Sequence, residues 1–324
     1  MVEGQSVVTG RYGTLGEMYY VDGKYWPHNT ALYVTTFKGN DPKYIYYLLT
    51  CLGRIRTSDK SAVPGVNRNE LHEMAVPAIT DKDQQKKIAA VLSALDAKID
   101  CNNRINAELE AMAKALYDYW FVQFGFPDAH GKPFKSSGGK TVYNATLKRE
   151  IPEAWSNGTL ADLISFEYGK SLKADIRTGN GYPVIGSNGV VDYHAEFLVT
   201  GPGIVVGRKG TVGAVTYLHD NFFPIDTTYY VKPVVDIEFI YLKYLRSSQG
   251  LEKMNSDSAV PGLNREAALR TSAAIPSVTL IKQFELKLTP AFKKLHEIEQ
   301  ENHLLAQLRD WLLPLLMNGQ VTVA

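Results

Sequence analysis

Two long segments of the chain carry apolar residues at the alternating spacing of four and three that is typical of helices packed against one another. In the first segment these positions are Ile88, Leu92, Leu95, Ile99, Leu109 and Leu116. In the second segment they are Leu288, Leu295, Ile298, Leu305 and Leu312. Residues 81–124 contain neither proline nor glycine, so the first segment is predicted to be one helix about 65 Å long at ~1.5 Å per residue. An antiparallel coiled coil would let each helix cover the apolar stripe of the other.

The sequence repeats itself at a fixed distance. Gly-Arg-Tyr-Gly-Thr-Leu-Gly at residues 10–16 recurs as Gly-Arg-Lys-Gly-Thr-Val-Gly at residues 207–213, an offset of 207 − 10 = 197 residues. Ser-Ala-Val-Pro-Gly-Val-Asn-Arg at residues 61–68 recurs at 258–265 with one conservative change and the same offset. Each copy leads into one of the long helices, so the chain is predicted to contain two copies of one unit.

Outside the helices, short β-type runs alternate with turns, as in Leu-Tyr-Val at 32–34 and Gly-Ile-Val-Val-Gly at 203–207. The predicted fold is mixed α/β: two strand-rich domains separated by two long antiparallel coiled-coil helices, with a pseudo-two-fold internal repeat. The predicted boundaries are 1–80 for the first strand-rich domain, 81–125 for the first helix, 126–149 for a linker rich in Gly, Pro and Ser, 150–278 for the second domain, and 279–324 for the second helix and tail.

The composition is that of an ordinary globular protein, with 324 residues, 45% apolar and 21% charged, and a formal net charge of +1. No run approaches the roughly 18 consecutive apolar residues of a membrane-spanning helix, and no secretory signal is recognisable. We therefore expect a cytoplasmic protein with no membrane segment. Cys51 and Cys101 have no metal-ligand spacing and are expected to be plain thiols. The net charge gives no bulk signature of nucleic-acid binding, which would have to come from local basic surfaces.

Several catalytic patterns are missing from the sequence. Gly169-Lys170-Ser171 resembles the end of a phosphate-binding loop, but Ile164 stands where the first glycine should be. The repeated glycine motif lacks the G-x-G-x-x-G spacing and more simply predicts a tight turn between strands. Neither an H-E-x-x-H metal motif nor a G-x-S-x-G nucleophile elbow is found, and no Asn-Pro-Pro-Tyr motif of adenine methyltransferases occurs. The chain is expected to be non-catalytic and to bind no metal or cofactor itself.

Several predicted turns are rich in side chains that pair with base edges and phosphates. Arg and Lys pair with guanine, Asn pairs with adenine, and Ser, Thr and backbone amides contact phosphate. The candidate DNA-binding residues are Arg11, Tyr12, Thr14, Lys170, Ser171, Ser187, Asn188, Arg208, Lys209, Thr211, Asn264 and Arg265. For any single loop the alternative is an ordinary turn residue, and for Asn264 it is the N-cap of a helix.

These features together resemble a known family. The order of globular unit and long helix, twice over, is combined with Ser-x-x-Pro-Gly-x-Asn-Arg before each helix, Ile-Pro-x-x-Trp at 151–155 and Tyr-Pro-Val-Ile-Gly-Ser-Asn-Gly at 182–189. This combination resembles the DNA specificity subunit of Type I restriction-modification systems over essentially the whole chain. The resemblance implies two target recognition domains, each reading one half of a bipartite site in double-stranded DNA.

The resemblance also implies partners. Two methyltransferase subunits, which bind S-adenosylmethionine, would dock on the two helices. Restriction subunits that use ATP and Mg would join the full complex. This chain would supply sequence recognition and spacing, and it would bind none of these cofactors.

The sequence departs from the family pattern in its first unit. Between Ile151 and Gly207 there are 207 − 151 = 56 residues, whereas only 10 − 1 = 9 separate Met1 from Gly10. We expect the first recognition domain to be N-terminally truncated and to lack counterparts of Lys170 and Ser187. A homodimer that uses the second domain twice would restore two readers. The alternative function is an assembly or competitor protein that binds methyltransferase subunits without reading DNA specifically.

Overall fold

The computed structural model describes residues 1–11, 17–51, 68–248, 250 and 262–324. They form two compact units. Unit 1 comprises Met1–Asn106 and Glu297–Ala324, and unit 2 comprises Ala107–His296. The two long helices, α3 (Lys82–Tyr117) and α6 (Val278–Met317), each contribute residues to both units. Tyr12 and Thr14, together with most of the first Ser-Ala-Val-Pro-Gly motif, lie outside the described residues.

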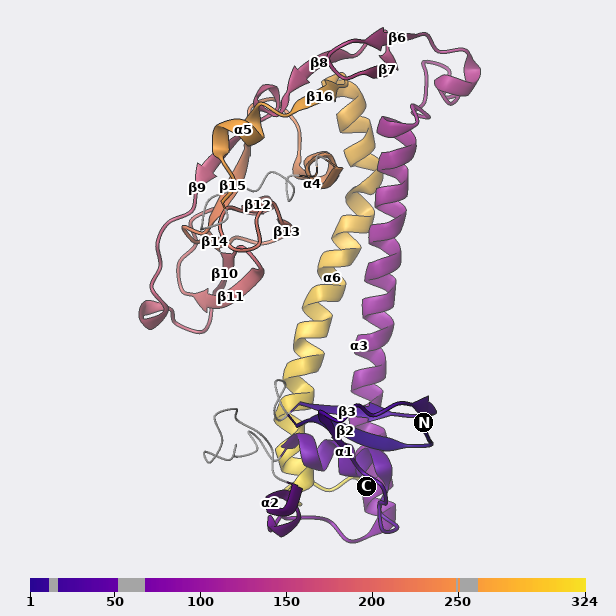
Figure 1. Ribbon diagram of the computed structural model, residues 1–324, viewed down its shortest axis with the longest axis vertical. Coiled ribbons are helices and arrows are strands. Elements are labelled where there is room, and N and C mark those ends of the chain that lie inside the picture. Colours follow the sequence, from indigo (N-terminus) through magenta and orange to yellow (C-terminus); the bar gives the residue numbers. More distant parts are fainter. Residues whose placement is uncertain (12–16, 52–67, 249, 251–261) are drawn as a thin grey trace. The chain divides into compact units, whose positions relative to one another are not determined.

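Unit 1 contains a small antiparallel sheet in the order β3-β2-β5 and a separate ladder between β1 and β4. Helix α1 packs against β2 and β3 (Figure 1). The elements before α3 are β1 (Val2–Glu3), β2 (Ser6–Gly10), β3 (Met18–Val21), β4 (Lys24–Tyr25), β5 (Ala31–Tyr33), α1 (Pro42–Cys51) and α2 (Arg68–Glu73). Asp41 starts α1, because its Oδ1 accepts the N–H of Tyr44 at 2.9 Å and Pro42 occupies the first helical position.

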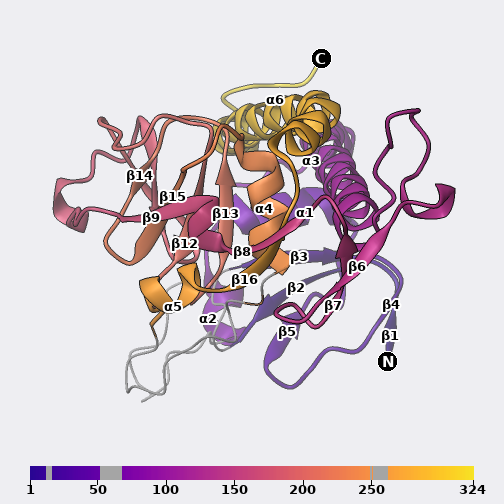
Figure 2. The ribbon, with the colours of Figure 1, turned by 90° about the horizontal axis from the view of Figure 1, so that it is seen from above.

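Unit 2 is built on a four-stranded antiparallel sheet in the order β13-β12-β15-β9, and a second sheet has the order β11-β10-β14. Helix α4 packs against β12 and β13 (Figure 2). The elements after α3 are η1 (Asp118–Val122), η2 (Lys135–Ser137), β6 (Thr141–Asn144), β7 (Arg149–Pro152), β8 (Ser156–Thr159), η3 (Leu160–Asp162), β9 (Ile164–Tyr168), η4 (Ala174–Ile176), β10 (Tyr182–Gly186), β11 (Gly189–His194), β12 (Gly203–Gly207), β13 (Val215–Leu218), β14 (Phe223–Pro224), β15 (Thr228–Pro233), α4 (Phe239–Ser248), α5 (Arg265–Leu269) and β16 (Ser272–Ile275), which pairs with β8.

The internal repeat holds at the level of strand register. At the sequence offset of 197 residues, β2, β3 and α1 coincide in both bounds with β12, β13 and α4. Val8 lies opposite Tyr19 and Tyr33, and its counterpart Val205 lies opposite Thr216 and Tyr230, the residues at the same offset. The predicted mixed α/β fold with an internal repeat is confirmed. β9, β10 and β11 have no counterpart among the described residues of unit 1.

The two long helices run antiparallel within each unit. In unit 1, Asn102 of α3 contacts Asn302 of α6, and Asp96 of α3 contacts Arg309 of α6. Residues earlier in α3 therefore contact residues later in α6. In unit 2, the ring of Phe284 on α6 lies 6.1 Å from that of Tyr117, at the C-terminal end of α3. Helix α6 continues without a break through Pro290.

The apolar residues of α3 and α6 are buried most deeply where another element packs on the helix pair. Ile88 and Leu92 are fully buried because Tyr44 and Tyr47 of α1 belong to the same cluster. Of the remaining predicted seam positions, Leu288, Leu295 and Ile298 are buried, whereas Leu95, Ile99, Leu109, Leu116, Leu305 and Leu312 are half-buried. The helix pair is therefore not a uniform coiled-coil seam, since a two-helix contact alone covers only part of each stripe.

The segment predicted as a linker takes part in the core of unit 2. Phe126 is buried, and its ring is stacked on Trp155 at 5.6 Å and on Phe134 at 4.7 Å. The segment also forms β6, which pairs with β7. The segment does contain turns, as its Gly, Pro and Ser residues indicated. Phe126 and Phe134, however, pack it against the core of unit 2.

Candidate nucleic-acid interface

Turns that follow β10 and β12 meet at one carbonyl group in unit 2. The backbone N–H groups of Arg208 and Lys209 donate to the carbonyl oxygen of Thr227 at 2.9 and 3.1 Å. The hydroxyl of Ser187, in the turn between β10 and β11, donates to the same oxygen at 2.7 Å. Three of the predicted DNA-binding residues are thus held by a single acceptor, and their positions depend on one another.

The turn after β9 is attached to the same segment. Gly169 donates its N–H to the carbonyl of Thr228 at 3.2 Å, and Lys170 donates its N–H to that of Pro224 at 3.0 Å. A Cβ on Gly169 would lie 2.1 Å from the carbonyl oxygen of Ile225, so no other residue fits there. The Lys170 side chain is exposed, as is that of the following Ser171.

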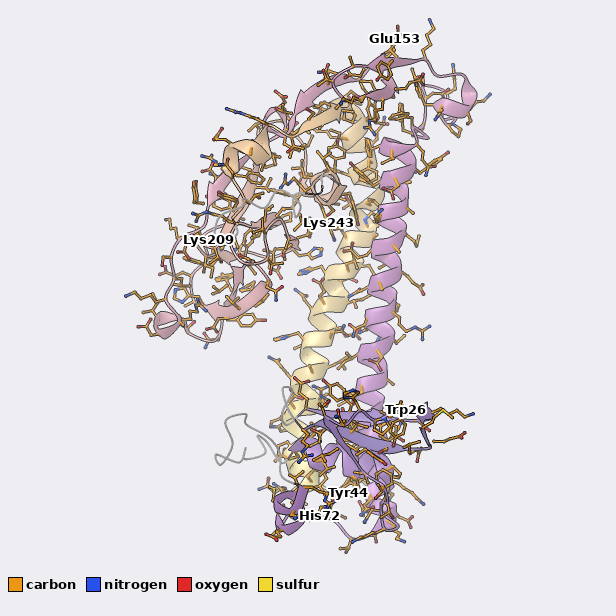
Figure 3. All side chains as sticks on the ribbon, in the orientation of Figure 1. Trp26, Tyr44, His72, Glu153, Lys209 and Lys243 are labelled. Atoms are coloured by element: carbon orange, nitrogen blue, oxygen red, sulfur yellow. The ribbon has the colours of Figure 1, made fainter. Side chains whose placement is uncertain are left out.

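The repeated glycine motif forms the turn between β12 and β13. A Cβ on Gly207 would lie 2.1 Å from the carbonyl oxygen of Thr211, and Gly210 has a φ of +79°. The glycines therefore allow a tight turn, as the sequence indicated, and the turn presents Lys209 and Thr211 to solvent. Lys209 is labelled in Figure 3.

Two arginines flank an exposed tyrosine at this end of the sheet. The Cζ atoms of Arg208 and Arg265 lie 5.1 and 5.8 Å from the ring centroid of Tyr168, whose side chain is 50% exposed. Arg208 donates from Nη1 to the carbonyl of Asp226 at 2.8 Å, and Arg265 Nη2 lies 4.0 Å from a carboxylate oxygen of Glu167. Tyr168 was missed by sequence reasoning, although it directly precedes Gly169-Lys170-Ser171.

The segment before α5 completes the cluster. Leu263 donates its N–H to the carbonyl of Arg208 at 2.8 Å, and the Tyr229 hydroxyl donates to the carbonyl of Leu263 at 3.1 Å. Burial raises the pKa of the Tyr229 hydroxyl, which keeps it a donor. Asn264 is the N-cap of α5, since its Oδ1 accepts the N–H of Ala267 at 2.9 Å. Asn264 therefore caps a helix, which was the alternative to a role in base reading.

The remaining candidates are less tied to this cluster. Asn188 is exposed in the turn between β10 and β11. In unit 1, Arg11 is exposed and donates its backbone N–H to the carbonyl of Thr30 at 2.7 Å. This contact is the counterpart, at the offset of 197, of the contact from Arg208 to Thr227. The backbones of the two arginines are therefore held by corresponding carbonyl groups in the two units.

The chemistry of the cluster is that of a binding surface. Lys170, Arg208 and Lys209 on turns and Arg265 at the start of α5 give four cations beside the exposed ring of Tyr168. Such groups pair with phosphate oxygens and guanine edges. In the described part of the chain, no three His, Cys, Asp or Glu residues are grouped to hold a metal ion. No helix there combines the length and the apolar character that crossing a bilayer requires.

Comparisons with known proteins converge on one family. Residues 1–111 and 152–277 match the family model described as Type I restriction modification DNA specificity domain. The chain is 24% identical over 322 residues to the Type I restriction enzyme HindI specificity subunit of Haemophilus influenzae, covering 75% of this chain and 68% of that protein. It is 33% identical over 133 residues to the MjaIX specificity subunit of Methanocaldococcus jannaschii, covering 40% of this chain and 28% of that protein.

A solved structure shares the fold. The crystal structure of the Type I restriction-modification system S subunit from M. genitalium superposes with a TM-score of 0.58 at 20% identity. The match covers 98% of this chain and 84% of that chain.

Proposed function

Because the chain belongs to the Type I restriction-modification DNA specificity family, we propose that it reads a bipartite target in double-stranded DNA through its two strand-rich domains. In this proposal it is non-catalytic. It docks two methyltransferase subunits, which carry S-adenosylmethionine, and the restriction subunits that carry ATP and Mg join them.

One observation carries the DNA-reading part of the proposal. The turns that bear Ser187, Arg208 and Lys209 share the carbonyl oxygen of Thr227. Specific recognition requires side chains held in a fixed mutual arrangement, because a misplaced donor cannot match a base edge. A surface whose loops are locked by shared backbone contacts meets that requirement, whereas independent turn residues would not.

The helices offer apolar surface for the docking part of the proposal. In unit 2, an open groove of about 810 Å³ is lined by Leu109, Met112, Leu116, Tyr119 and Leu288, among others. Met112 is largely exposed, and in unit 1 so are Leu304 and Trp311 on α6. Exposed apolar side chains at helical spacing suit a helical partner, which we assign to the methyltransferase subunits.

DNA binding by the assembled methyltransferase tests the reading surface. We expect Arg208→Ala with Lys209→Ala to weaken binding at least about tenfold and to reduce the slope of log K against log salt by about 2. The matched control is Lys135→Ala with Lys140→Ala, which removes two exposed lysines of unit 2 outside the cluster. Equal affinities for the two variants would exclude the β12–β13 turn from the interface.

A second candidate function is an assembly or competitor protein that binds methyltransferase subunits without reading DNA. It is supported by the exposed apolar side chains of the long helices, Met112, Leu304 and Trp311, which would bind a partner whether or not the cluster around Arg208 contacts DNA. Sequence-specific binding separates the two candidates, since only a reader distinguishes one duplex from another of equal length at the same salt concentration.

A further inference from the structure

An exposed tyrosine ends strand β9 of unit 2, beside the cations of the candidate interface. Tyr168 is the last residue of β9, and its side chain is 50% exposed. Its ring meets that of Tyr229 edge to face, with 5.1 Å between the ring centroids, interplanar angle 64°. Tyr229 is buried and stacks on Phe166, a core residue, at 5.4 Å. The exposed ring is therefore anchored on the core of unit 2, which sets its orientation.

Two guanidinium groups from different segments lie over this ring. The Cζ atom of Arg208, in the turn after β12, is 5.1 Å from the ring centroid, and that of Arg265, at the start of α5, is 5.8 Å from it. The electron-rich face of an aromatic ring attracts cations at such distances. The Nε atom of Arg265 is buried and has no hydrogen-bond partner in the described part of the chain. Tyr168 is therefore a contact that both arginines share.

Each guanidinium keeps N–H donors for a ligand. Arg208 donates from Nη1 to the carbonyl oxygen of Asp226 at 2.8 Å. The Nη2 atom of Arg265 lies 4.0 Å from a carboxylate oxygen of Glu167, which is beyond hydrogen-bond distance. A guanidinium carries several N–H donors in a planar fork. Both arginines are half-buried and oriented, yet neither fork is saturated by acceptors among the described residues.

A neighbouring carboxylate favours bases over phosphates as the ligand of these arginines. Glu167 precedes Tyr168 on β9, and its side chain is 37% exposed. A carboxylate repels the phosphate backbone, whereas it can accept a hydrogen bond from the N4 amino group of cytosine. The planar fork of an arginine matches O6 and N7 of guanine in the major groove, which is the commonest specific contact between proteins and DNA.

We propose that Tyr168 is a positioning residue for base reading, whose ring holds the guanidinium groups of Arg208 and Arg265 in place to pair with O6 and N7 of guanine. The half-site that unit 2 reads therefore contains guanine. This inference rests on the proposed function and deepens it, because it names the base that the surface around Tyr168 recognises.

Loss of the ring should change specificity and leave the charge of the surface as it is. Without the ring of Tyr168, the two guanidinium groups lose the contact that orients them, but both remain cations. Attraction to phosphates depends on the number of cations and should persist. Discrimination between bases depends on the orientation of the donors and should be lost.

A base analogue combined with a protein variant tests this role. The assembled methyltransferase is titrated with a duplex that carries its own methylated motif, in which 7-deazaguanine, a base without the N7 acceptor, replaces guanine in one half-site at a time. Replacement in one half-site should weaken binding by the parent complex at least about tenfold. Tyr168→Leu should weaken binding to the unmodified duplex by a similar factor. The same replacement should then cost this variant little more, because the two changes remove one interaction.

Two further variants separate positioning from folding. Tyr168→Phe keeps the ring and should restore the sensitivity to 7-deazaguanine. Tyr143→Leu changes another exposed tyrosine on a strand of unit 2, outside the cluster, and should bind both duplexes as the parent does.

Three results would overturn the proposal. In the first, the parent is insensitive to 7-deazaguanine in both half-sites. In the second, Tyr168→Leu keeps the full sensitivity of the parent. In the third, Tyr168→Leu binds the motif and a scrambled duplex more weakly by the same factor, which would assign the arginines to phosphates. A parent complex without a defined motif would instead contradict the proposed function itself, and this inference with it.

Discussion

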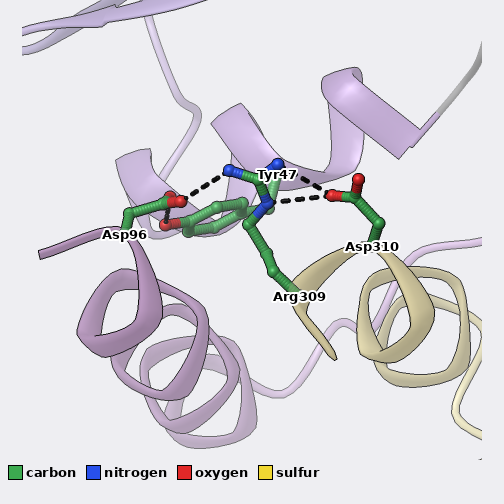
Figure 4. A network of polar contacts seen from close by, with 4 residues as sticks. All are labelled: Tyr47, Asp96, Arg309 and Asp310. Carbon is green, nitrogen blue, oxygen red and sulfur yellow. Dashed lines mark hydrogen bonds and ion pairs between the residues drawn. The ribbon is translucent and has the colours of Figure 1, made fainter. Parts of the chain in front are cut away.

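At the residue scale, a half-buried polar network joins three helices of unit 1 (Figure 4). Arg309 donates from Nη1 to Asp96 at 2.9 Å and from Nε to Asp310 at 2.9 Å. The Tyr47 hydroxyl donates to the other oxygen of Asp96. Burial, followed by this bond, raises the pKa of Tyr47. One arginine thus joins α6 to α3, and Asp96 in turn fixes α1.

Arg309→Ala is expected to destabilise the protein by about 1–2 kcal/mol, because it removes the guanidinium that pairs with the half-buried Asp96 carboxylate. Urea unfolding followed by circular dichroism measures the loss. Lys86→Ala is the control, since the ion pair of Lys86 with Asp83 is exposed and spans 3.9 Å. It should change the free energy of unfolding by less than about 0.5 kcal/mol. Equal effects would mean that the network contributes nothing.

A histidine pair in unit 2 is expected to make the stability of the protein depend on pH. The rings of His219 and His296 are stacked at 4.8 Å, and His296 lies 3.4 Å from Asp220. Burial, and then the neighbouring His296, lowers the pKa of His219 to about 4. An unfolded histidine titrates near about 6.5, so the unfolded chain binds more protons between these values.

The contribution of neutral His219 to the free energy of unfolding should therefore be fully present above pH ~6.5 and be lost as the pH is lowered toward about 4. His219→Phe keeps an aromatic ring beside Tyr217 and Phe292 but cannot take up a proton. We expect its melting temperature to decline less than that of the parent between pH 7 and pH 5, measured by calorimetry. Parallel pH profiles for the two proteins would show that His219 does not titrate in this way.

The residue scale also shows what the sequence could and could not predict about the site. Arg208 and Lys209 were found because the glycine turn that carries them is repeated. Tyr168 was not, because exposure of an aromatic at the end of a strand depends on which neighbours cover it. Asn264 satisfied two patterns, base reading and helix capping, and only its bond to the N–H of Ala267 identifies the cap.

At the element scale, the antiparallel register of the helices is marked by an asparagine pair. Asn102 is 1% exposed and donates to Asn302 at 2.9 Å and to Glu301 at 2.8 Å. Asn302 donates to Asn103 at 2.9 Å. A buried amide such as that of Asn102 favours one register, because a slip of the helices would leave it without its partners on α6.

Asn102→Ala should destabilise the protein by about 1–2 kcal/mol, since it leaves the Asn302 carbonyl oxygen without its donor. Asn102→Leu with Asn302→Leu should recover most of that loss, because an apolar pair needs no partners. The free energies of unfolding of Asn102→Leu, Asn302→Leu and the double variant give the coupling between the two residues. Additive losses would exclude the pair as the device that sets the register.

The periodicity of apolar residues predicted the two long helices, but it did not predict what packs against them. The spacing of Ile88, Leu92, Leu288 and Leu295 identified both helices and their apolar stripes. It could not identify α1 as the cover of Ile88 and Leu92, because a stripe does not specify its partner. The segment 126–149 was predicted as a linker from its turn residues, whereas Phe126 and Phe134 pack in the core.

At the scale of the whole molecule, the repeat gives the chain two units that share one strand arrangement. The shared strands keep the same register at an offset of 197 residues, and each long helix contributes to both units. Replacing residues 150–278 by the corresponding domain of a relative should therefore change one half of the recognised DNA sequence and leave the other half unchanged. Change in both halves would mean that the domains do not read independently.

Co-expression of the chain with its methyltransferase subunits, followed by sequencing of N6-methyladenine, tests the central claim most directly. We expect methylation at a bipartite motif, and loss of the preference for one half-site in the variant with Arg208→Ala and Lys209→Ala. A palindromic motif would indicate a homodimer that uses the second domain twice. A soluble complex that purifies with its methyltransferase subunits but methylates no defined sequence would contradict the claim and favour an assembly protein.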